Sequence, residues 1–295
     1  MRKIGFIGVG TMGTPMASNL IKAGYELVVC DRMAEKLKPL TALGARIASS
    51  PAEVARQCDV VMTMLPADAA VKEVVLGAGG IAEGASAGLI VIDSSTVMPA
   101  TSKQLAAELA KINVAMLDAP VTGSEPQAIE GKLTFIVGGD KEIYGKCVPL
   151  FEAMGKTTFH MGPNGAGSYT KLANNTISAI TLVAFAEGVV LATKAGIDPK
   201  LFVDVISIGG ARSGQIANKA PKILNRDFHP NFATALMYKD LGLAGEVARE
   251  LNVPTPALAI AREMLNMALA KGYGAEDVCS VIKCYEEWAH IEVHK

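Results

Sequence analysis

The sequence predicts an α/β domain of the doubly wound Rossmann type followed by an all-α domain. Three observations predict it. A glycine-rich turn directly follows the first apolar run, short β-branched runs alternate with helical patterns through the first half, and long alanine- and leucine-rich segments replace them after about Gly165. We place the boundary near Pro163, so that the sheet domain covers residues 1–163 and the helical domain covers residues 164–295.

The expected strands are apolar runs bounded by turn residues, because a strand buried on both faces of a parallel sheet shows no alternation. Five runs have this character: KIGFIG (3–8), ELVVCD (26–31), VVMTML (60–65), LIVIDSS (89–95) and AMLDAP (115–120). Two more strand-like runs follow, LTFIVGG (133–139) and TTFHMG (157–162). Helix-like segments such as PMASNLIKAG (15–24) lie between them and stop at a glycine. This alternation predicts a parallel, doubly wound sheet.

The composition excludes several classes of protein. Half of the 295 residues are apolar and 19% are charged, so the chain can bury a sizeable core, and its length favours two domains or one large one. The 28 basic and 29 acidic side chains give a formal net charge of -1. That balance argues against a nucleic-acid-binding protein that works by neutralising phosphates.

The cysteines and histidines predict neither disulfides nor a metal site. The five cysteines are scattered without a CxxC pair, and the four histidines form no ligand cluster. Glycines interrupt the apolar N-terminal run, which argues against a signal peptide. The long apolar stretch 177–196 contains Glu187 and Lys194, so it reads as a buried helix better than as a membrane span. We expect a cytoplasmic protein with reduced thiols.

The sequence GVGTMG predicts a dinucleotide site. It places Gly8, Gly10 and Gly13 in the G-x-G-x-x-G spacing, directly after a strand and at the start of a helix. Glycines there allow a tight turn, a close approach of the backbone to a pyrophosphate, and close packing of helix on strand. Asp31 ends the second expected strand about twenty residues on, where a carboxylate can bind ribose hydroxyls. The alternative is a purely structural glycine turn.

Arg32 bears on which nicotinamide cofactor is used. An arginine after the acidic residue can hold the 2′-phosphate of NADP, whereas the Asp31 carboxylate repels that phosphate. The alternative for Arg32 is a solvated side chain. The pair favours NAD over NADP.

Three polar or turn-rich segments are candidates for ligand contacts. Residues 64–66 and 94–96 follow strands and fall at the carboxyl edge of the predicted sheet, where open α/β folds bind ligands. In DAPVTGSEPQAIEG (118–131), Thr122, Gly123 and Ser124 can offer backbone N–H groups and hydroxyls to an anion such as a carboxylate. Ordinary loop chemistry is the alternative for all of them.

The segment GAGSYTKLANN (165–175) starts the predicted helical domain. Residues four apart share a helix face, so Lys171 and Asn175 can point together into one cleft. The helix dipole disfavours a cation near a helix N-terminus and favours release of its proton. A lysine in that setting suits a general acid in carbonyl reduction, and an exposed surface lysine is the alternative.

Four ordered motifs resemble the β-hydroxyacid dehydrogenase family over the whole chain. They are IGFIGVGTMGTPMASNL at the start, DAPVTGSEPQAIEG in the middle, GAGSYTKLANN at the domain junction and KDLGLA (239–244). The resemblance implies an N-terminal Rossmann domain, a helical C-terminal domain used for homodimers or homotetramers, and an active site between them. The family loop usually reads Ser-Gly-Gly where this chain has Thr122–Gly123–Ser124, a departure in the implied substrate pocket.

The resemblance also implies roles for individual residues. Lys171 is the implied catalytic residue, assisted by Asn175. The implied substrate site consists of Ser95, Thr122, Gly123, Ser124, Lys171 and Asn175. The implied cofactor site consists of Gly8, Gly10, Thr11, Met12, Gly13, Asp31, Arg32, Met64, Leu65, Pro66, Thr96 and Lys239.

The expected activity is the NAD(P)-dependent reduction of a short semialdehyde acid, such as tartronate semialdehyde to D-glycerate. The segments VKEVVLGAGGIAEGA, EPQAIEGKL and YEEWAHIEVHK favour this substrate by resemblance. The alternatives are 3-hydroxyisobutyrate or 2-(hydroxymethyl)glutarate dehydrogenase activity, or oxidation of a related 3-hydroxy acid. A non-catalytic nucleotide sensor is a different class, which has no use for Lys171 and Asn175 in a cleft.

Overall fold

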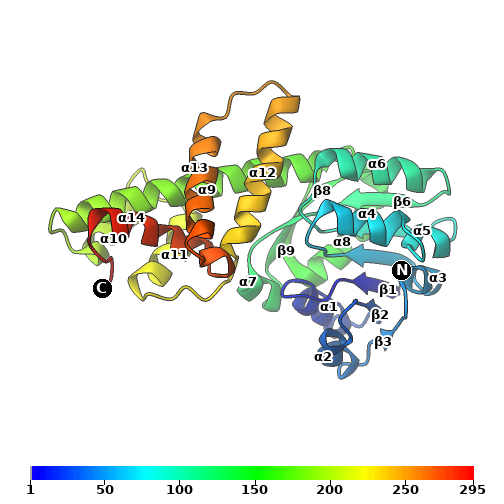
Figure 1. Ribbon diagram of the computed structural model, residues 1–295. Coiled ribbons are helices and arrows are strands. Elements are labelled where there is room, and N and C mark those ends of the chain that lie inside the picture. The colour runs from blue at the N-terminus through cyan, green and yellow to red at the C-terminus, as the bar shows by residue number, and fades with distance from the viewer. Residues whose placement is uncertain (1) are drawn as a thin grey trace. The chain divides into compact units, whose positions relative to one another are not determined.

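The structure is a computed structural model that describes residues 2–295 (Figure 1). The chain divides into two compact units, of which the first ends at Lys171 and the second runs from Leu172 to Lys295. The first contains the sheet, and the second is helical throughout its described residues apart from loops and one isolated β-bridge. The expected fold class is confirmed.

One sheet contains every strand within residues 2–295. The strands are β1 (Lys3–Ile7), β2 (Glu26–Cys30), β3 (Arg46–Ile47), β4 (Val60–Thr63), β5 (Ile90–Asp93), β6 (Ala115–Asp118), β7 (Val121–Thr122), β8 (Leu133–Gly138) and β9 (Gly155–Gly162). Their order is β3-β2-β1-β4-β5-β6-β8-β7, with β9 paired to β8. The order reverses beside β1, which puts the glycine turn after β1 at the topological switch point of the sheet.

One end of the sheet departs from the parallel arrangement. The six strands from β3 to β6 are parallel, but β8 is antiparallel to both β6 and β7. Between β6 and β8 the chain has only the short β7 and the five-residue helix α7 (Glu125–Ile129), so it turns back without a long crossover helix. β8 reads as an apolar run because it is buried on both faces, which does not reveal its direction.

Helices cover both faces of the sheet. The other helices of the first unit are α1 (Gly13–Lys22), η1 (Ala34–Leu37), α2 (Lys38–Thr41), α3 (Pro51–Gln57), α4 (Asp68–Leu76), α5 (Ile81–Gly84), α6 (Pro99–Ala110) and α8 (Lys141–Met154). α1, α2 and α8 contribute to one core with Ile4 and Phe6 of β1, whereas α3 to α6 share the opposite core with Ile7. Burial on both faces explains why the parallel strands read as continuous apolar runs.

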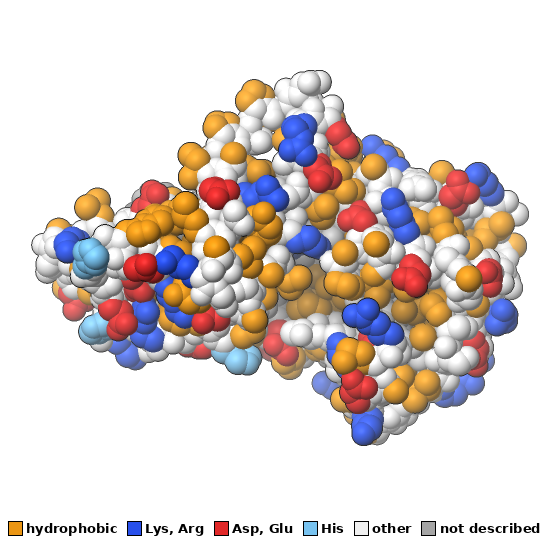
Figure 2. Space-filling model, viewed as in Figure 1, with side chains coloured by type: hydrophobic (Ala, Val, Ile, Leu, Met, Phe, Trp, Pro, Cys, Tyr) orange, Lys and Arg blue, Asp and Glu red, His pale blue; other side chains and the backbone are white. Residues whose placement is uncertain are grey.

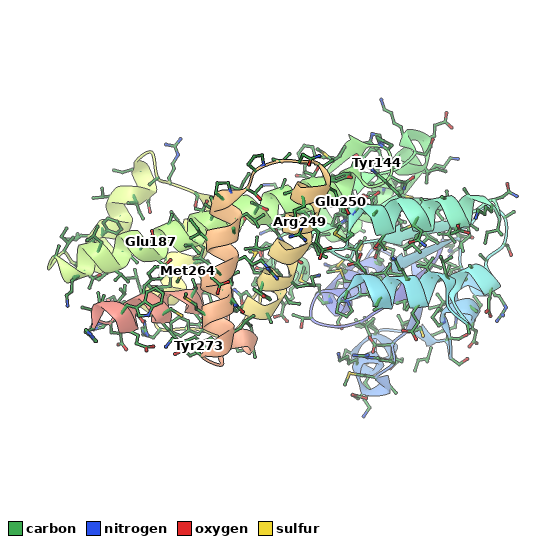
Figure 3. The ribbon with its side chains drawn as sticks, turned by 45° about the horizontal axis from the view of Figure 1, so that its top comes forward. Tyr144, Glu187, Arg249, Glu250, Met264 and Tyr273 are labelled. Atoms are coloured by element: carbon green, nitrogen blue, oxygen red, sulfur yellow. The ribbon has the colours of Figure 1, made fainter. Side chains whose placement is uncertain are left out.

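A single 29-residue helix, α9 (Ala166–Lys194), starts in the first unit and continues into the second. The helices that follow are α10 (Pro199–Ile208), α11 (Gly214–Leu224), α12 (Thr234–Glu250), α13 (Pro256–Ala270), η2 (Tyr273–Ala275), η3 (Val278–Val281) and α14 (Ile282–Ala289). Figure 3 marks Glu187 on α9, whose carboxylate accepts a hydrogen bond from the Tyr285 hydroxyl at 3.2 Å, and Met264 on α13. The apolar faces of these helices form one core.

Among the helices within residues 2–295, α9 alone is long and apolar enough to cross a membrane by length and composition. Its most apolar window has a mean hydropathy of 1.8, and 44% of that window is buried. The core helix of a water-soluble protein meets the same criteria. Leu182, Ala186 and Val189 on α9 are almost fully buried in the core of the second unit, which supports the interpretation as a core helix.

Candidate active site

The glycine turn after β1 has the geometry that a dinucleotide loop requires. Gly8 has a φ of +90°, its N–H donates to the carbonyl of Cys30 at 3.1 Å, and any side chain there would collide with the backbone of Met64. A side chain on Gly13 would collide with the carbonyl of Gly8, so this glycine lets α1 pack against the turn. Gly10 faces open space, the place where the backbone must admit a pyrophosphate.

Asp31 follows β2 and braces the same turn. One carboxylate oxygen accepts the N–H of Val9 and the other accepts the N–H of Met33, both at 2.9 Å. A carboxylate has about four lone-pair positions, so these two bonds leave acceptor capacity for ribose hydroxyls. Arg32 is exposed next to it. The residues present therefore fit a nicotinamide dinucleotide.

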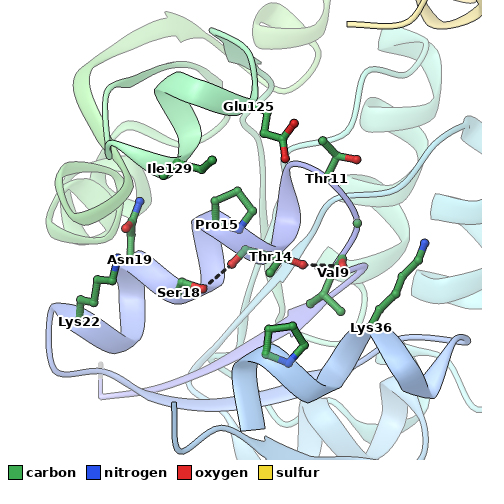
Figure 4. Close-up of a pocket in the computed structure, with 12 residues that line it drawn as sticks. Val9, Thr11, Thr14, Pro15, Ser18, Asn19, Lys22, Lys36, Glu125 and Ile129 are labelled. Carbon is green, nitrogen blue, oxygen red and sulfur yellow. Dashed lines mark hydrogen bonds between the residues drawn. The ribbon is translucent and has the colours of Figure 1, made fainter. Parts of the chain in front are cut away.

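A cavity of about 540 Å³ runs along the surface of α1 from the glycine turn (Figure 4). Val9, Gly10 and Thr11 line it at the turn, and Lys36 and Glu125 line its sides. It lies wholly within the first unit, and it is continuous with the predicted cofactor loop.

The loops after β4 and β5 are held together by one buried carboxylate. Asp93 Oδ1 accepts hydrogen bonds from the Thr63 hydroxyl at 2.7 Å, the Ser95 hydroxyl at 2.6 Å and the Ser95 N–H at 3.1 Å. The Ser95 hydroxyl also accepts the N–H of Leu65 at 2.9 Å. Met64, Leu65, Pro66, Ser95 and Thr96 thus lie at neighbouring strand ends, as the sequence predicts for a ligand-binding edge.

Ser95 has a structural task that sequence reasoning missed. Its side chain is 1% exposed and bridges Asp93 to the backbone of Leu65. Its predicted contact with substrate stays a prediction. Asp93 itself lies beside Asp118 in the register of β5 and β6, and burial raises the pKa of both carboxyls despite their hydrogen bonds.

The candidate carboxylate loop is braced from within. Thr122 ends β7, Gly123 has a φ of +120°, and Ser124 precedes α7. The N–H and the hydroxyl of Ser124 both donate to Gln127 Oε1, at 2.9 and 2.7 Å. An anion that used these donors would have to displace the Gln127 side chain. A side chain on Gly123 would point at Leu133 and Gln127 instead, with Leu133 Cδ2 only 2.8 Å away.

Lys171 and Asn175 lie one turn apart on α9 and are both buried, with exposures of 9% and 3%. The structure thus excludes the alternative of an exposed surface lysine. Asn175 is fixed in place, because its amide nitrogen donates to Asp240 Oδ2 at 2.7 Å and its oxygen accepts from Asn174 at 3.2 Å. Their spacing places both residues on one face of α9, and their predicted entry into one cleft stays a prediction.

Sequence reasoning missed Asp240, which contacts two of the predicted site residues. It is 2% exposed and lies between two predicted residues of the second unit, because its Oδ2 accepts from Asn175 and its Oδ1 lies 3.1 Å from Lys239 Nζ. A signal was available, since Asp240 follows Lys239 in the motif KDLGLA. Within residues 2–295, no group of three or more His, Cys, Asp or Glu side chains has the geometry to hold a metal ion.

Two family models together match most of the chain. Residues 3–162 match the NAD binding domain of 6-phosphogluconate dehydrogenase, and residues 165–285 match the NAD-binding region of NADP-dependent 3-hydroxyisobutyrate dehydrogenase. Mitochondrial 3-hydroxyisobutyrate dehydrogenase of Mus musculus is 38% identical over 96% of this chain and 87% of its own length. The chain belongs to the β-hydroxyacid dehydrogenase family.

Other members of the family agree with this assignment. NAD-dependent L-serine dehydrogenase of Pseudomonas aeruginosa is 38% identical over 97% of this chain and 98% of its own. The solved structure of Mycobacterium tuberculosis 3-hydroxyisobutyrate dehydrogenase with L-serine is 31% identical, with a TM-score of 0.89 over 97% of this chain and 99% of the other. Family membership makes this chain an oxidoreductase of CH–OH groups that uses a nicotinamide cofactor.

Proposed function

We propose that the protein reduces a short semialdehyde acid, tartronate semialdehyde to D-glycerate, and that NAD is its preferred cofactor. The observation that carries the reaction type is the buried pair Lys171 and Asn175 on one face of α9. The tartronate assignment rests on the sequence segments that resemble the family's semialdehyde reductases. A nicotinamide dinucleotide held by its pyrophosphate at the glycine turn would supply the hydride.

Lys171 is the proposed general acid. Its ammonium donates a proton to the carbonyl oxygen as negative charge develops there, and in the oxidative direction the neutral amine accepts the hydroxyl proton. The Asn175 amide nitrogen carries two hydrogens, of which one is donated to Asp240. The second can orient the same substrate oxygen beside Lys171.

The proposed NAD preference rests on Asp31. A carboxylate at the end of β2 accepts ribose hydroxyls and repels a 2′-phosphate. Gly8, Gly10 and Gly13 would hold the pyrophosphate at the start of α1, and Leu65 and Thr96 would border the cofactor from the neighbouring strand ends.

Oxidation of a small 3-hydroxy acid is the second candidate. Relatives named for 3-hydroxyisobutyrate and for L-serine are both 38% identical to this chain. The same acid and base chemistry at Lys171 serves either direction. Substrate choice then depends on the loop from Thr122 to Ser124, where this chain departs from the usual family sequence.

We also propose a homo-oligomer in the cytoplasm. Apolar side chains of the second unit lie on its surface (Figure 2), and α10 has no buried residue. Large exposed apolar surfaces mark contacts between proteins. The cytoplasmic location is supported by the cysteines, all of which are free thiols.

The decisive experiment combines a substrate panel with Lys171→Met. The native protein is assayed with NADH and NADPH on tartronate semialdehyde, and with NAD and NADP on 3-hydroxyisobutyrate, L-serine and 2-(hydroxymethyl)glutarate. We expect the highest kcat/KM for tartronate semialdehyde with NADH. Lys171→Met should lower kcat about a hundredfold or more, with the Kd for NADH nearly unchanged.

Lys194→Met is the matched control, because Lys194 lies on the same helix but at its exposed far end, where it donates to the carbonyl of Ala289. We expect that variant to keep native turnover. Near-native turnover of Lys171→Met would disprove the general-acid role, and a higher kcat/KM on another substrate of the panel would disprove the tartronate assignment.

A further inference from the structure

The first turn of α9 is held by a carboxylate from the sheet. Asp118, the last residue of β6, accepts the N–H of Gly165 on Oδ1 at 2.8 Å and the N–H of Ser168 on Oδ2 at 2.9 Å. The first N–H groups of a helix have no partner within the helix, and a neighbouring side chain usually caps them. Gly165 precedes α9 and has no side chain, so Asp118 caps the helix from 47 residues away.

Glycines let the backbone close directly around this carboxylate. A side chain on Gly167 would collide with the carbonyl oxygens of Ile136 and Asp118. A side chain on Gly138 would lie 2.6 Å from Asp118 Oδ1 and 2.8 Å from the nitrogen of Gly167. Glycines at both positions allow the backbone of β8 and the first turn of α9 to pack in direct contact.

The contact between the sheet and the first turn of α9 is buried. Asp118 is 1% exposed and Ser168 is 2% exposed. The Ser168 hydroxyl lies 3.0 Å from the hydroxyl of Ser102 on α6, which anchors the same turn from another side. Since a buried polar group that loses its partner is costly, displacing this turn from the sheet is unfavourable.

Lys171 lies three residues after Ser168, less than one helical turn along α9. A general acid works only within hydrogen-bond reach of its substrate atom, and a shift of about 1 Å can cost about a hundredfold in rate. A displacement of the first turn would therefore be transmitted to the lysine through rigid helical backbone.

We propose that Asp118 is a positioning residue for Lys171, holding the first turn of α9 against the sheet so that the lysine reaches the substrate oxygen. This inference rests on the proposed function. It assigns a task in turnover to Asp118, the first residue of DAPVTGSEPQAIEG, and to both glycines of GAGSYTKLANN.

The first test is Asp118→Asn in the full-length protein. The substitution keeps the shape but sets an NH₂ group against one of the two backbone N–H donors. With tartronate semialdehyde and NADH, and with 3-hydroxyisobutyrate and NAD as a second assay, we expect kcat to fall at least about tenfold. The Kd for NADH, measured by fluorescence titration, should stay within about twofold, because the carboxylate of Asp118 binds the start of α9 and not the cofactor loops.

Asp140→Ala is the control for a lost cap. Asp140 precedes α8 and accepts the N–H groups of Glu142 and Ile143 on Oδ1, both at 2.9 Å. Asp140→Ala removes both of these bonds, whereas asparagine would keep the capping oxygen, and α8 contains no predicted site residue. We expect a lower Tm and a native kcat. A similar loss of kcat in both variants would show that Asp118 acts through general stability, and would overturn the inference.

Gly167→Ala tests this contact from the helix side. It keeps the carboxylate and both donors but forces the turn away from Ile136, so it should reproduce the loss of kcat with an unchanged Kd for NADH. Gly145→Ala is its control, because Gly145 lies inside α8 with open space around it. If Asp118→Asn is insoluble, this pair decides, and native kcat in Gly167→Ala overturns the inference.

A double-mutant cycle separates this inference from the proposed function. If Asp118 acts through Lys171, then Asp118→Asn should lower kcat by less than about twofold in the Lys171→Met background. If the double variant loses the product of the two single losses in kcat, the inference alone is overturned. The same holds if Lys171→Met loses kcat while Asp118→Asn keeps the native kcat. Near-native turnover of Lys171→Met would overturn the proposed function and the inference together. The assay of Lys171→Met by itself detects this outcome.

Discussion

Asp93 is a carboxyl group enclosed by protein, with one oxygen saturated and the other without a hydrogen-bond partner among residues 2–295. Burial raises its pKa, while hydrogen bonds from Ser95 and Thr63 lower it and the neighbouring Asp118 raises it further. The net effect raises the pKa above its ordinary value. The folded protein therefore favours the protonated form more than the unfolded chain does.

This sign predicts how the free energy of unfolding varies with pH. A raised pKa in the folded state contributes stability that is complete below the ordinary value of 3.8 and is lost as the pH rises through the folded pKa. Asp93→Asn cannot ionise at this position. The free energy of unfolding of the variant should therefore rise relative to that of the native protein as the pH increases from 3.8 through the folded pKa. Urea denaturation of both proteins from pH 4 to pH 8 measures this difference. A difference in the free energy of unfolding that stays constant over the range would contradict the raised pKa of Asp93.

Asp31 sets the expected cofactor preference. Its carboxylate should give NADH a higher kcat/KM than NADPH, and Asp31→Asn should shift the ratio toward NADPH, because the exposed Arg32 can then pair with the 2′-phosphate. Asparagine also loses one of the two acceptors for Val9 and Met33, so Tm is recorded alongside. Equal or better use of NADPH by the native protein would disprove the preference.

At the scale of an element, the loop between β7 and α7 is predicted to bind the carboxylate of the substrate. Charge-assisted hydrogen bonds to a carboxylate are worth about 1.5 to 3 kcal/mol each. Thr122→Val removes one hydroxyl without the collision that a side chain on Gly123 would cause. We expect kcat/KM for tartronate semialdehyde to fall about tenfold or more, the rate equivalent of that energy.

Glycolaldehyde, which lacks the acid group, is the matched substrate. The native protein should use it poorly, and Thr122→Val should not change its kcat/KM. Equal kcat/KM for the two aldehydes on the native protein would mean that the loop does not read the carboxylate.

Strands with a sequence pattern of their own were predictable. Strands defined only by their hydrogen bonds to a neighbouring strand were not. Apolar runs gave β1, β2, β4, β5 and β6, because each is buried on both faces. The two-residue strands β3 and β7 have no period to detect, since they are defined by their hydrogen bonds to β2 and β8. The direction of β8 escaped for a similar reason.

The same distinction applies to the site. The glycine turn and the pair Lys171 and Asn175 are local patterns, so spacing alone brought them to notice. Asp118 and Asp240 act on α9 from 47 and 65 residues away, and no window of sequence contains both partners. Their roles required the fold.

At the scale of the whole molecule, the surface of α10 predicts self-association. Leu201, Val205 and Ile208 are 62%, 64% and 83% exposed, and their spacing puts them on one helix face. We expect the native protein to sediment as a dimer or larger, and Val205→Lys to shift it toward the monomer. Ile47→Lys is the control, because Ile47 is 57% exposed in the first unit. A native protein that sediments as a monomer would contradict the prediction.

The unbroken course of α9 makes the protein sensitive to helical phase. Each residue turns the helix by about 100°, so one inserted residue between Lys171 and Asn175 would swing the asparagine away from the lysine's side. A loop can change its conformation to accommodate an insertion. In a helix, the insertion rotates every later residue about the helix axis. Substitutions can therefore accumulate between these two residues while insertions and deletions cannot, and chimaeras with relatives should exchange this stretch only in register.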